Sequence, residues 1–325
     1  MRWTSKRCRI VSVATICPVL QTDYETLPSC WICGSDRTFL WKHNNLNRSL
    51  QPDDFRITDH RYGTTLSLLR CSDCNFLFAP PDEIESIVAN YEQLEDPDYE
   101  KGRETRALQM RRLLEDALNR HPDAKTMLDI GSGIGLMVRE AIDMGLDAEG
   151  VEPSYDLVER AEAVNKVKLH RGIFPHPDLQ GRDFDIILLV DVIEHVSDPT
   201  QLLRDCRNAL AADGLLVVVT PDLESIAARL LGPRWWHFRL AHVGYFTRKT
   251  LNDAAKRAGL AIDAWLRPSW FFPVRYLAHR VGEYLPIRPL NKLADALPPT
   301  RWMYDQVIQL NLCDSITVYL KKTDS

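Results

Sequence analysis

The residues with the clearest chemical meaning are one acid and three glycines near the middle of the chain. Asp129 stands two positions before Gly131, and Gly133 and Gly135 follow at alternate positions. An apolar run ends just before this turn and an amphipathic segment begins just after it, so the glycines join a strand to a helix. Glycine has no Cβ atom, so the backbone can approach a ligand closely, and the first N–H groups of the helix are free to bind it. The turn therefore predicts a ligand-binding site.

A second acid, Glu152, follows the next apolar run, about twenty residues beyond the first glycine, where nucleotide-binding sheets place a carboxylate that accepts the ribose hydroxyls. The glycine spacing, Gly-x-Gly-x-Gly, is one residue shorter than the dinucleotide fingerprint Gly-x-Gly-x-x-Gly. An NAD(P)-dependent oxidoreductase needs the longer spacing. We therefore keep it as an alternative rather than as the main hypothesis.

Four of the eight cysteines form two Cys-x-x-Cys pairs: Cys30, Cys33, Cys71 and Cys74. Such pairs suit one tetrahedral zinc ion, and four thiolates leave no open position for catalysis. Gly34 and Asn75 each follow a pair and can adopt the left-handed backbone conformation that a metal-binding knuckle needs. Paired cysteines without a disulfide pattern favour a reducing, cytoplasmic setting.

Strands and helices alternate around the glycine turn, as the periodicity of apolar residues indicates. Predicted strands span residues 126–130, 148–151, 167–170, 184–190, 215–220 and 260–266. Predicted helices span residues 101–120, 136–144, 156–165, 199–210 and 247–258. This alternation implies a Rossmann-like, doubly wound α/β sheet that is mostly parallel. Residues 306–312 and 316–321 are β-rich and predict a hairpin-like pair that adds an antiparallel edge strand.

The chain is expected to divide into four parts. Residues 1–27 contain a faint likeness to a secretory signal, but a disordered leader is the preferred interpretation. Residues 28–81 predict a small β-rich zinc ribbon, and residues 82–267 together with 304–325 predict the α/β core. Residues 268–303, rich in aromatics and prolines, predict an insert that acts as a lid or packing appendage. Lining an acceptor site or resting on a membrane surface are the alternatives for this insert.

Composition limits the partners of the protein. The 325 residues carry a net charge of -5, which offers no basic surface for nucleic acid. No apolar run approaches the roughly 20 residues that a membrane-spanning helix needs. We therefore expect a small-molecule partner, and the composition carries no sign of an oligomeric state.

The acid and glycine turn resembles the first motif of class I S-adenosylmethionine-dependent methyltransferases. In that family the acid lies beside the amino-acid part of the cofactor and the glycines make room for the methionine and ribose. The resemblance implies these roles for Asp129 and for Gly131, Gly133 and Gly135, and it implies that Glu152 binds the ribose. Residues 170–174 lack the acid that many members place near the adenine. Backbone groups and packing by Ile173 or Phe174 would then hold the base.

Two further segments extend this resemblance. Asp191, Glu194 and His195 match the pattern acid-x-x-Glu-His, which implies that Asp191 faces the cofactor and that His195 is a general base or a helix cap. Ubiquinone-biosynthesis O-methyltransferases use a similar pattern for a divalent metal, but we favour a structural turn over Mg²⁺ or Mn²⁺. His242 and Tyr245 lie in a segment similar to one of methyltransferase family 23 that covers the substrate opening. Either could deprotonate or orient an acceptor, and packing or helix capping is the alternative role for the histidine.

The cysteine-rich part resembles the zinc-binding N-terminal part of bacterial methyltransferases that include deoxysugar C-methyltransferases, in which the ribbon helps to cover the acceptor pocket. The combined resemblance implies methyl transfer from S-adenosylmethionine to a small molecule, such as a nucleotide-linked sugar or glycan precursor. A second alternative is a non-catalytic zinc-ribbon adaptor with a degenerate methyltransferase fold. The intact acids Asp129 and Glu152 and the three glycines argue against it.

Overall fold

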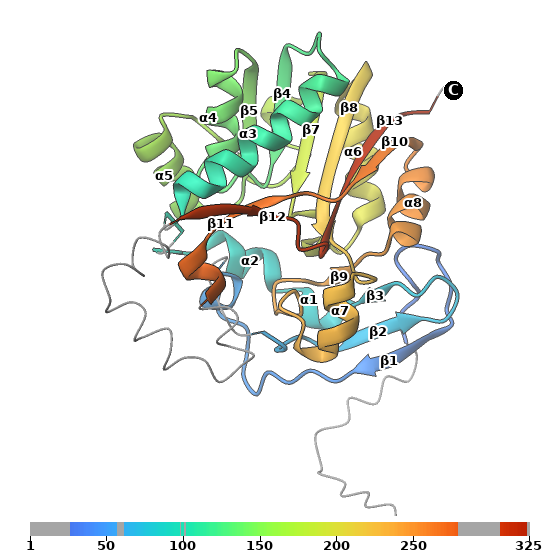
Figure 1. The fold of residues 1–325 in the computed structure, drawn as a ribbon. Coiled ribbons are helices and arrows are strands. Elements are labelled where there is room, and N and C mark those ends of the chain that lie inside the picture. Colours follow the sequence, from blue (N-terminus) through green and yellow to red (C-terminus); the bar gives the residue numbers. More distant parts are fainter. Residues whose placement is uncertain (1–26, 57–61, 98, 101, 279–305, 324–325) are drawn as a thin grey trace, which may run out of the picture.

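The computed structural model describes residues 27–56, 62–97, 99–100, 102–278 and 306–323. Nearly all of the predicted leader and residues 279–303 of the predicted insert lie outside the described residues. The core is a seven-stranded sheet with the strand order β10-β13-β8-β7-β4-β5-β6 (Figure 1). Its strands are β4 (Thr126–Ile130), β5 (Asp147–Glu152), β6 (His170–Arg171), β7 (Phe184–Val190), β8 (Leu210–Pro221), β10 (Leu260–Leu266) and β13 (Ser315–Lys322).

The direction of the strands confirms a mostly parallel, doubly wound sheet. Strand β4 pairs in parallel with both β5 and β7, β6 continues beside β5, and β8 continues beside β7. The chain therefore extends the sheet first to one side of β4 and then to the other. At such a switch point the loops after neighbouring strands separate, and a crevice opens at the carboxyl ends of the strands.

The predicted antiparallel edge strand is wrong in its position. Strand β13 is antiparallel, but it lies inside the sheet between β8 and β10, and β10 forms the edge. Residues Ser315 to Leu320 are buried without alternation, which is typical of an internal strand covered on both faces. The expected hairpin with residues 306–312 is also wrong. Strand β12 (Val307–Leu310) pairs instead with β11 (Trp270–Pro273) in a separate two-stranded sheet.

Helices cover both faces of the large sheet (Figure 1). One face packs against α3 (Arg103–Arg120) and α4 (Leu136–Asp143), and the other packs against α6 (Pro199–Ala209) and α8 (Arg248–Arg257). Helix α5 (Tyr155–Arg160) continues as a π-helical turn, Ala161–Asn165. Asp198 and Thr247 cap α6 and α8 because their side chains accept backbone N–H groups of the first turn. Among the described helices, none is long and apolar enough to cross a membrane.

A second, four-stranded sheet joins the N-terminal part to the core. Its order is β1 (Thr38–Lys42), β2 (Leu68–Cys71), β3 (Leu77–Phe78) and β9 (Gly244–Tyr245). Because β9 comes from the middle of the core sequence, the cysteine-rich part and the core share this sheet. Shorter helical segments are η1 (Pro52–Phe55), α1 (Pro81–Ile84), α2 (Ile87–Glu92), η3 (Pro177–Leu179), η4 (Ile193–His195), α7 (Ile226–Leu231) and η5 (Gly232–Arg234).

Candidate functional site

A cavity of about 390 Å³ opens at the switch point of the large sheet. The glycine turn contributes Asp129, Gly131 and Gly133 to its wall, and the segment after β7 contributes Asp191 and His195. Further wall residues come from the segment that precedes the large sheet and from β11. They include Tyr91, Tyr99, Arg106 and Trp270. The sequence thus predicted one side of the cavity, and the other side became visible only in the fold.

Two of the glycines serve different purposes. A Cβ atom on Gly133 would lie 2.5 Å from the hydroxyl oxygen of Tyr99, so glycine is needed where this tyrosine meets the turn. A Cβ atom on Gly135 would lie 2.4 Å from a methyl group of Val167, away from the cavity wall. The third glycine therefore allows the helix to pack closely on its neighbours, which is the third role known for glycines in such turns.

The two acids of the site are buried. Asp129 is 4% exposed, and burial raises its pKa to about 8. Glu152 is fully buried, and burial raises its pKa to about 7 although hydrogen bonds from Ser154, Gly133 and Tyr91 oppose that rise. Its carboxylate accepts the backbone N–H groups of Gly133 at 2.8 Å and Ser154 at 2.9 Å. Glu152 therefore lies directly behind the glycine turn, and Tyr91, which lines the cavity, is hydrogen-bonded to it.

Arg106 of α3 is a site residue that the sequence analysis missed. Its guanidinium group stacks on the ring of Tyr99, 4.3 Å from the ring centroid. Among the described residues, its Nε and Nη2 atoms are buried without a hydrogen-bond partner. An unpaired buried cation is costly, so this arginine is prepared for an anionic group of a ligand in the cavity. No spacing rule indicates such a residue because its missing partner is visible only in three dimensions.

The histidines of the site lie close together, with His242 buried and His195 half-buried. His195 lines the cavity, its Nδ1 atom lies 2.7 Å from the carbonyl oxygen of Ala241, and burial lowers its pKa to about 4. His242 also lines the cavity and meets the His195 ring edge-on at 4.8 Å between centroids. Burial, the largest cause, holds the pKa of His242 well below its usual value. Tyr245 is 2% exposed and packs against Phe238, and it is not among the residues that line the cavity.

The divalent metal set suggested by the sequence is not assembled. Glu194 and His195 gather with His242, their ligand atoms lying within 4.8 Å of one another, and Asp191 is not part of this group. The carboxylate of Glu194 accepts the hydroxyl group of Thr220 at 2.9 Å, and burial raises its pKa well above the usual value. The structure therefore brings Glu194 and His195 together with His242 rather than with Asp191.

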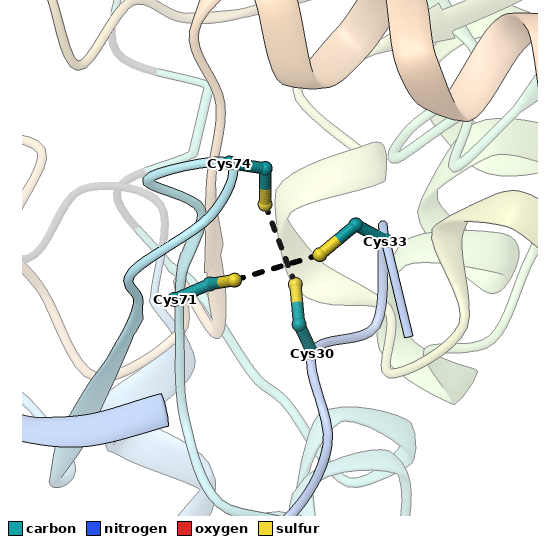
Figure 2. Close-up of side chains that lie close together, drawn as sticks. All are labelled: Cys30, Cys33, Cys71 and Cys74. Atoms are coloured by element: carbon teal, nitrogen blue, oxygen red, sulfur yellow. Dashed lines mark hydrogen bonds between the residues drawn. The ribbon is translucent and has the colours of Figure 1, made fainter. Parts of the chain in front are cut away.

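The four paired cysteines converge on one point (Figure 2). The sulfur atoms of Cys30 and Cys74 are 3.5 Å apart, as are those of Cys33 and Cys71, and all four lie within 4.8 Å of one another. The hydrogen bond from the Cys74 thiol holds the pKa of Cys30 well below its usual value.

The backbone around the cysteines has the predicted knuckle shape. Gly34 and Asn75 have φ angles of 75° and 64°, which confirms the predicted left-handed residues. The N–H groups of these two residues donate to the carbonyl oxygens of Cys30 and Cys71. Each pair therefore folds its own tight turn before the two turns meet.

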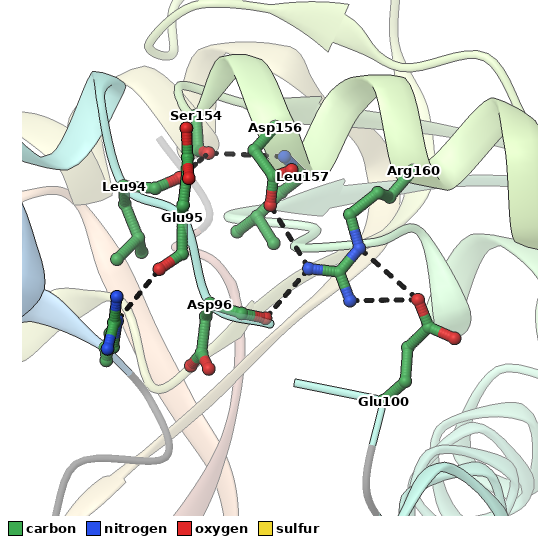
Figure 3. A network of polar contacts seen from close by, with 9 residues as sticks. Leu94, Glu95, Asp96, Glu100, Ser154, Asp156, Leu157 and Arg160 are labelled. Carbon is green, nitrogen blue, oxygen red and sulfur yellow. Dashed lines mark hydrogen bonds and ion pairs between the residues drawn. The ribbon is translucent and has the colours of Figure 1, made fainter. Parts of the chain in front are cut away.

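A polar network fixes the segment that carries Tyr91 and Tyr99 over the site (Figure 3). Arg160 of α5 donates to the carbonyl oxygen of Asp96 at 2.8 Å and to the carboxylate of Glu100 at 2.9 Å. The hydroxyl group of Ser154 donates to the carbonyl oxygen of Leu94 at 3.0 Å. The segment between α2 and α3 is therefore tied to α5, next to Glu152.

These observations define the class of protein. A glycine turn, with a second-strand acid bonded behind it, borders a cavity on the switch point of a doubly wound sheet, which is the arrangement of a Rossmann-like domain that binds a nucleoside-containing cofactor. The family profile described as a methyltransferase domain, family 23, matches residues 102–264, about half of the chain. The chain belongs to this family.

Two curated relatives are ubiquinone biosynthesis O-methyltransferases. The protein of Cereibacter sphaeroides is 30% identical over 146 residues, which cover 41% of this chain and 59% of the relative. The protein of Bradyrhizobium sp. is 34% identical over 123 residues, 36% of this chain and 44% of the relative. This chain therefore spans about half the length of the curated relatives that it matches. The expected relationship to sugar C-methyltransferases is not confirmed by these relatives.

Among solved structures, a methyltransferase of Thermotoga maritima has a similar fold. It is described as S-adenosylmethionine-dependent and as a possible histamine N-methyltransferase. It is 20% identical with a TM-score of 0.44, and the match covers 74% of this chain and 98% of the other.

Proposed function

We propose that this chain transfers the methyl group of S-adenosylmethionine to a hydroxyl oxygen of a small, largely apolar molecule. The observation that carries the proposal is that Asp129 and Arg106, whose Nε and Nη2 atoms have no hydrogen-bond partner among the described residues, line one cavity. The amino-acid end of S-adenosylmethionine carries one ammonium and one carboxylate group. An acid and an arginine at that end satisfy both charges.

The rest of the cofactor follows from this orientation. Glu152 would accept the ribose hydroxyls in place of the Tyr91 hydroxyl, and Gly131 and Gly133 leave room for the nucleoside. Ile173 and Phe174 line the same cavity, where they could enclose the adenine by packing. Methyl transfer from a sulfonium depends mainly on in-line positioning, so a cavity that holds the cofactor and the acceptor in line would supply most of what the reaction needs.

The nature of the acceptor is supported by two observations. The relatives reported above are O-methyltransferases by name, which favours an oxygen acceptor over carbon or nitrogen. Met110, Val192 and Trp270 give the cavity wall an apolar character. A sugar nucleotide would need many polar partners there, so we no longer prefer a sugar or glycan precursor. His195 and His242 would border the acceptor, and Tyr245 would support the wall from behind.

Calorimetric titration of the full chain tests the cofactor assignment. S-adenosylhomocysteine, the product form, should bind with a dissociation constant in the micromolar range, and NAD⁺ and NADP⁺ should give no heat of binding. Binding of a nicotinamide nucleotide instead would support an oxidoreductase. If neither S-adenosylhomocysteine nor a nicotinamide nucleotide binds, the result would support a zinc-ribbon adaptor with a degenerate fold.

We also propose that the four paired cysteines bind a structural zinc ion. In a tetrahedral site with zinc–sulfur bonds of about 2.3 Å, neighbouring sulfur atoms lie about 3.8 Å apart. The observed separations of 3.5 Å are close to this value and far above the length of a disulfide bond. Zinc would hold both knuckles together. Because all four thiolates would coordinate the ion, no position would be open for a substrate.

A further inference from the structure

We propose that His237, oriented by Asp314, accepts the proton of a phenolic acceptor hydroxyl during methyl transfer. This inference rests on the proposed function and adds a catalytic residue that the sequence motifs do not include. His237 is in the wall of the cavity, and Asp314 lies just before β13, at the far end of the chain.

The Asp314 carboxylate is held in a fixed position. Its Oδ2 atom accepts the indole N–H of Trp236 at 2.9 Å and lies 3.2 Å from Nε2 of His237. Its backbone carbonyl accepts the N–H group of Asp222 at 2.8 Å. The carboxylate is 5% exposed, so the position of the His237 ring is determined by a group that is itself anchored.

Charge and tautomer follow from this contact. Burial alone would raise the pKa of Asp314, but the hydrogen bonds from His237 and Trp236 bring it below its usual value. An ionised carboxylate beside Nε2 places the imidazole proton on that atom and leaves the lone pair on Nδ1. Nδ1 makes no hydrogen bond to any described residue, so it remains able to accept a proton.

His237 shares the cavity wall with the residues that follow β7 and with His242. Asp191, which follows the carboxyl end of β7, lines the same cavity as His237. The His237 ring lies against His242 at 5.9 Å and meets Trp235 edge-on at 4.9 Å. His195 and His242 are poorer proton acceptors, since burial lowers the pKa of each.

The reaction balances without another reagent. The hydroxyl O–H bond breaks, its proton moves to Nδ1 of His237, and the oxygen forms a bond to the methyl carbon. The bond between that carbon and the sulfonium sulfur breaks, and its electron pair stays on sulfur. The resulting imidazolium faces the Asp314 carboxylate until the proton passes to water. A neutral imidazole suits a phenol of pKa about 10 far better than an aliphatic alcohol, because proton transfer works best between groups of similar pKa.

Two phenols of different acidity test this role. Transfer of a deuterated methyl group to phenol and to 4-nitrophenol is measured at about pH 8, where 4-nitrophenol is largely ionised and phenol is not. The full chain is compared with the variants His237→Asn, His237→Gln and Asp314→Asn. His43→Asn, a change to an exposed histidine outside the cavity, is the matched control. Binding of S-adenosylhomocysteine and the melting temperature are measured for every variant.

Both His237 variants should lose about 100-fold or more of the kcat/KM for phenol but less than about tenfold for 4-nitrophenol, which needs no base. Asp314→Asn should show the same pattern more weakly, and His43→Asn should match the unchanged protein. Equal losses on both phenols, or no loss, would overturn the inference. So would absence of transfer to both phenols by a protein that binds S-adenosylhomocysteine. A protein that fails to bind S-adenosylhomocysteine contradicts the proposed function itself.

Discussion

At the scale of single residues, Arg106 offers the sharpest test of how the cofactor is oriented. Replacing Arg106 by Gln should weaken binding of S-adenosylhomocysteine by about ten- to hundredfold, because a charged hydrogen bond is lost in a buried place. Binding of 5′-methylthioadenosine, which lacks the amino-acid part, should stay unchanged. Calorimetry with both ligands measures the difference.

Arg112→Gln is the control for this prediction, since Arg112 lies on the same helix with a side chain that is 54% exposed. An Arg106→Gln protein that loses affinity for both ligands equally would show that Arg106 supports the fold rather than the carboxylate. If the Arg106→Gln protein binds both ligands as tightly as the unchanged protein, the proposed orientation of the cofactor is wrong.

The buried carboxyl group of Asp129 should lower the stability of the unliganded protein at neutral pH. Its pKa is about 8 in the folded protein and 3.8 in its unperturbed form, so unfolding releases a proton between these values. Stability from this group is therefore present below about pH 4 and is lost as pH rises toward about 8. Asp129→Asn, which cannot ionise, should raise the melting temperature of the unliganded protein by a few degrees, or about 1 kcal/mol or more, most clearly near pH 8.

The same change should abolish tight binding of the cofactor, because the amide cannot pair with its ammonium group. Asp213→Asn, at an exposed aspartate, serves as the comparison and should change neither property. A destabilised Asp129→Asn protein at pH 8 would show that the carboxylate makes favourable contacts in the unliganded state.

Residues could be predicted where the signal was local. Asp129, Gly131 and Gly133 in the cavity wall and the left-handed Gly34 followed from spacing of a few positions, whereas Gly135 lies outside that wall. His237 and Asp314 are 77 positions apart, and no pattern within either segment links them. The cluster of aromatic side chains around His237 was visible in the sequence, but only packing shows which ring faces a cavity.

At the scale of elements, prediction succeeded where burial dictated the pattern. Strand β7 has the bounds that its apolar run indicated, because most of its side chains are buried on both faces of the sheet. Strand β13 was recognised as a strand but placed wrongly. Its apolar run shows that it is a strand, whereas its position depends on which neighbours β8 and β10 leave free, and this is a property of the whole sheet.

Tyr91, on helix α2, is expected to compete with the ribose of the cofactor for hydrogen bonding to Glu152. The hydrogen bond of Tyr91 to Glu152 lowers the pKa of that acid and occupies the place that a ribose hydroxyl would take. Tyr91→Phe leaves the carboxylate short of one donor in the unliganded protein. Affinity for S-adenosylhomocysteine should therefore rise about two- to tenfold, as measured by calorimetry.

Tyr155→Phe, at a tyrosine that is 48% exposed, should leave the affinity unchanged. Weaker binding by the Tyr91→Phe protein would mean that the Tyr91 hydroxyl contacts the cofactor rather than making way for it.

At the scale of the whole molecule, the cysteine cluster belongs to the same hydrophobic core as the large sheet. Cys30, Cys71 and Cys74 pack in one cluster with Leu128 and Phe246. The pairing of β3 with β9 and the hydrogen bond from Arg257 of α8 to the carbonyl oxygen of Cys33 add direct links. The cysteine-rich part therefore cannot loosen without disturbing the core.

Loss of zinc should consequently affect the distant cofactor site. Cys74→Ser should reduce the zinc content from one ion per chain to a small fraction, as measured by elemental analysis. The melting temperature should fall by about 5 °C or more, because metal-binding free energy is part of the folding free energy. Binding of S-adenosylhomocysteine should weaken as well, since Phe55, between the two cysteine pairs, lines the cavity.

Cys313→Ser, at a half-buried cysteine outside the cluster, should keep its zinc and its stability. A Cys74→Ser protein that loses zinc but keeps full stability and affinity would show that the two parts fold independently.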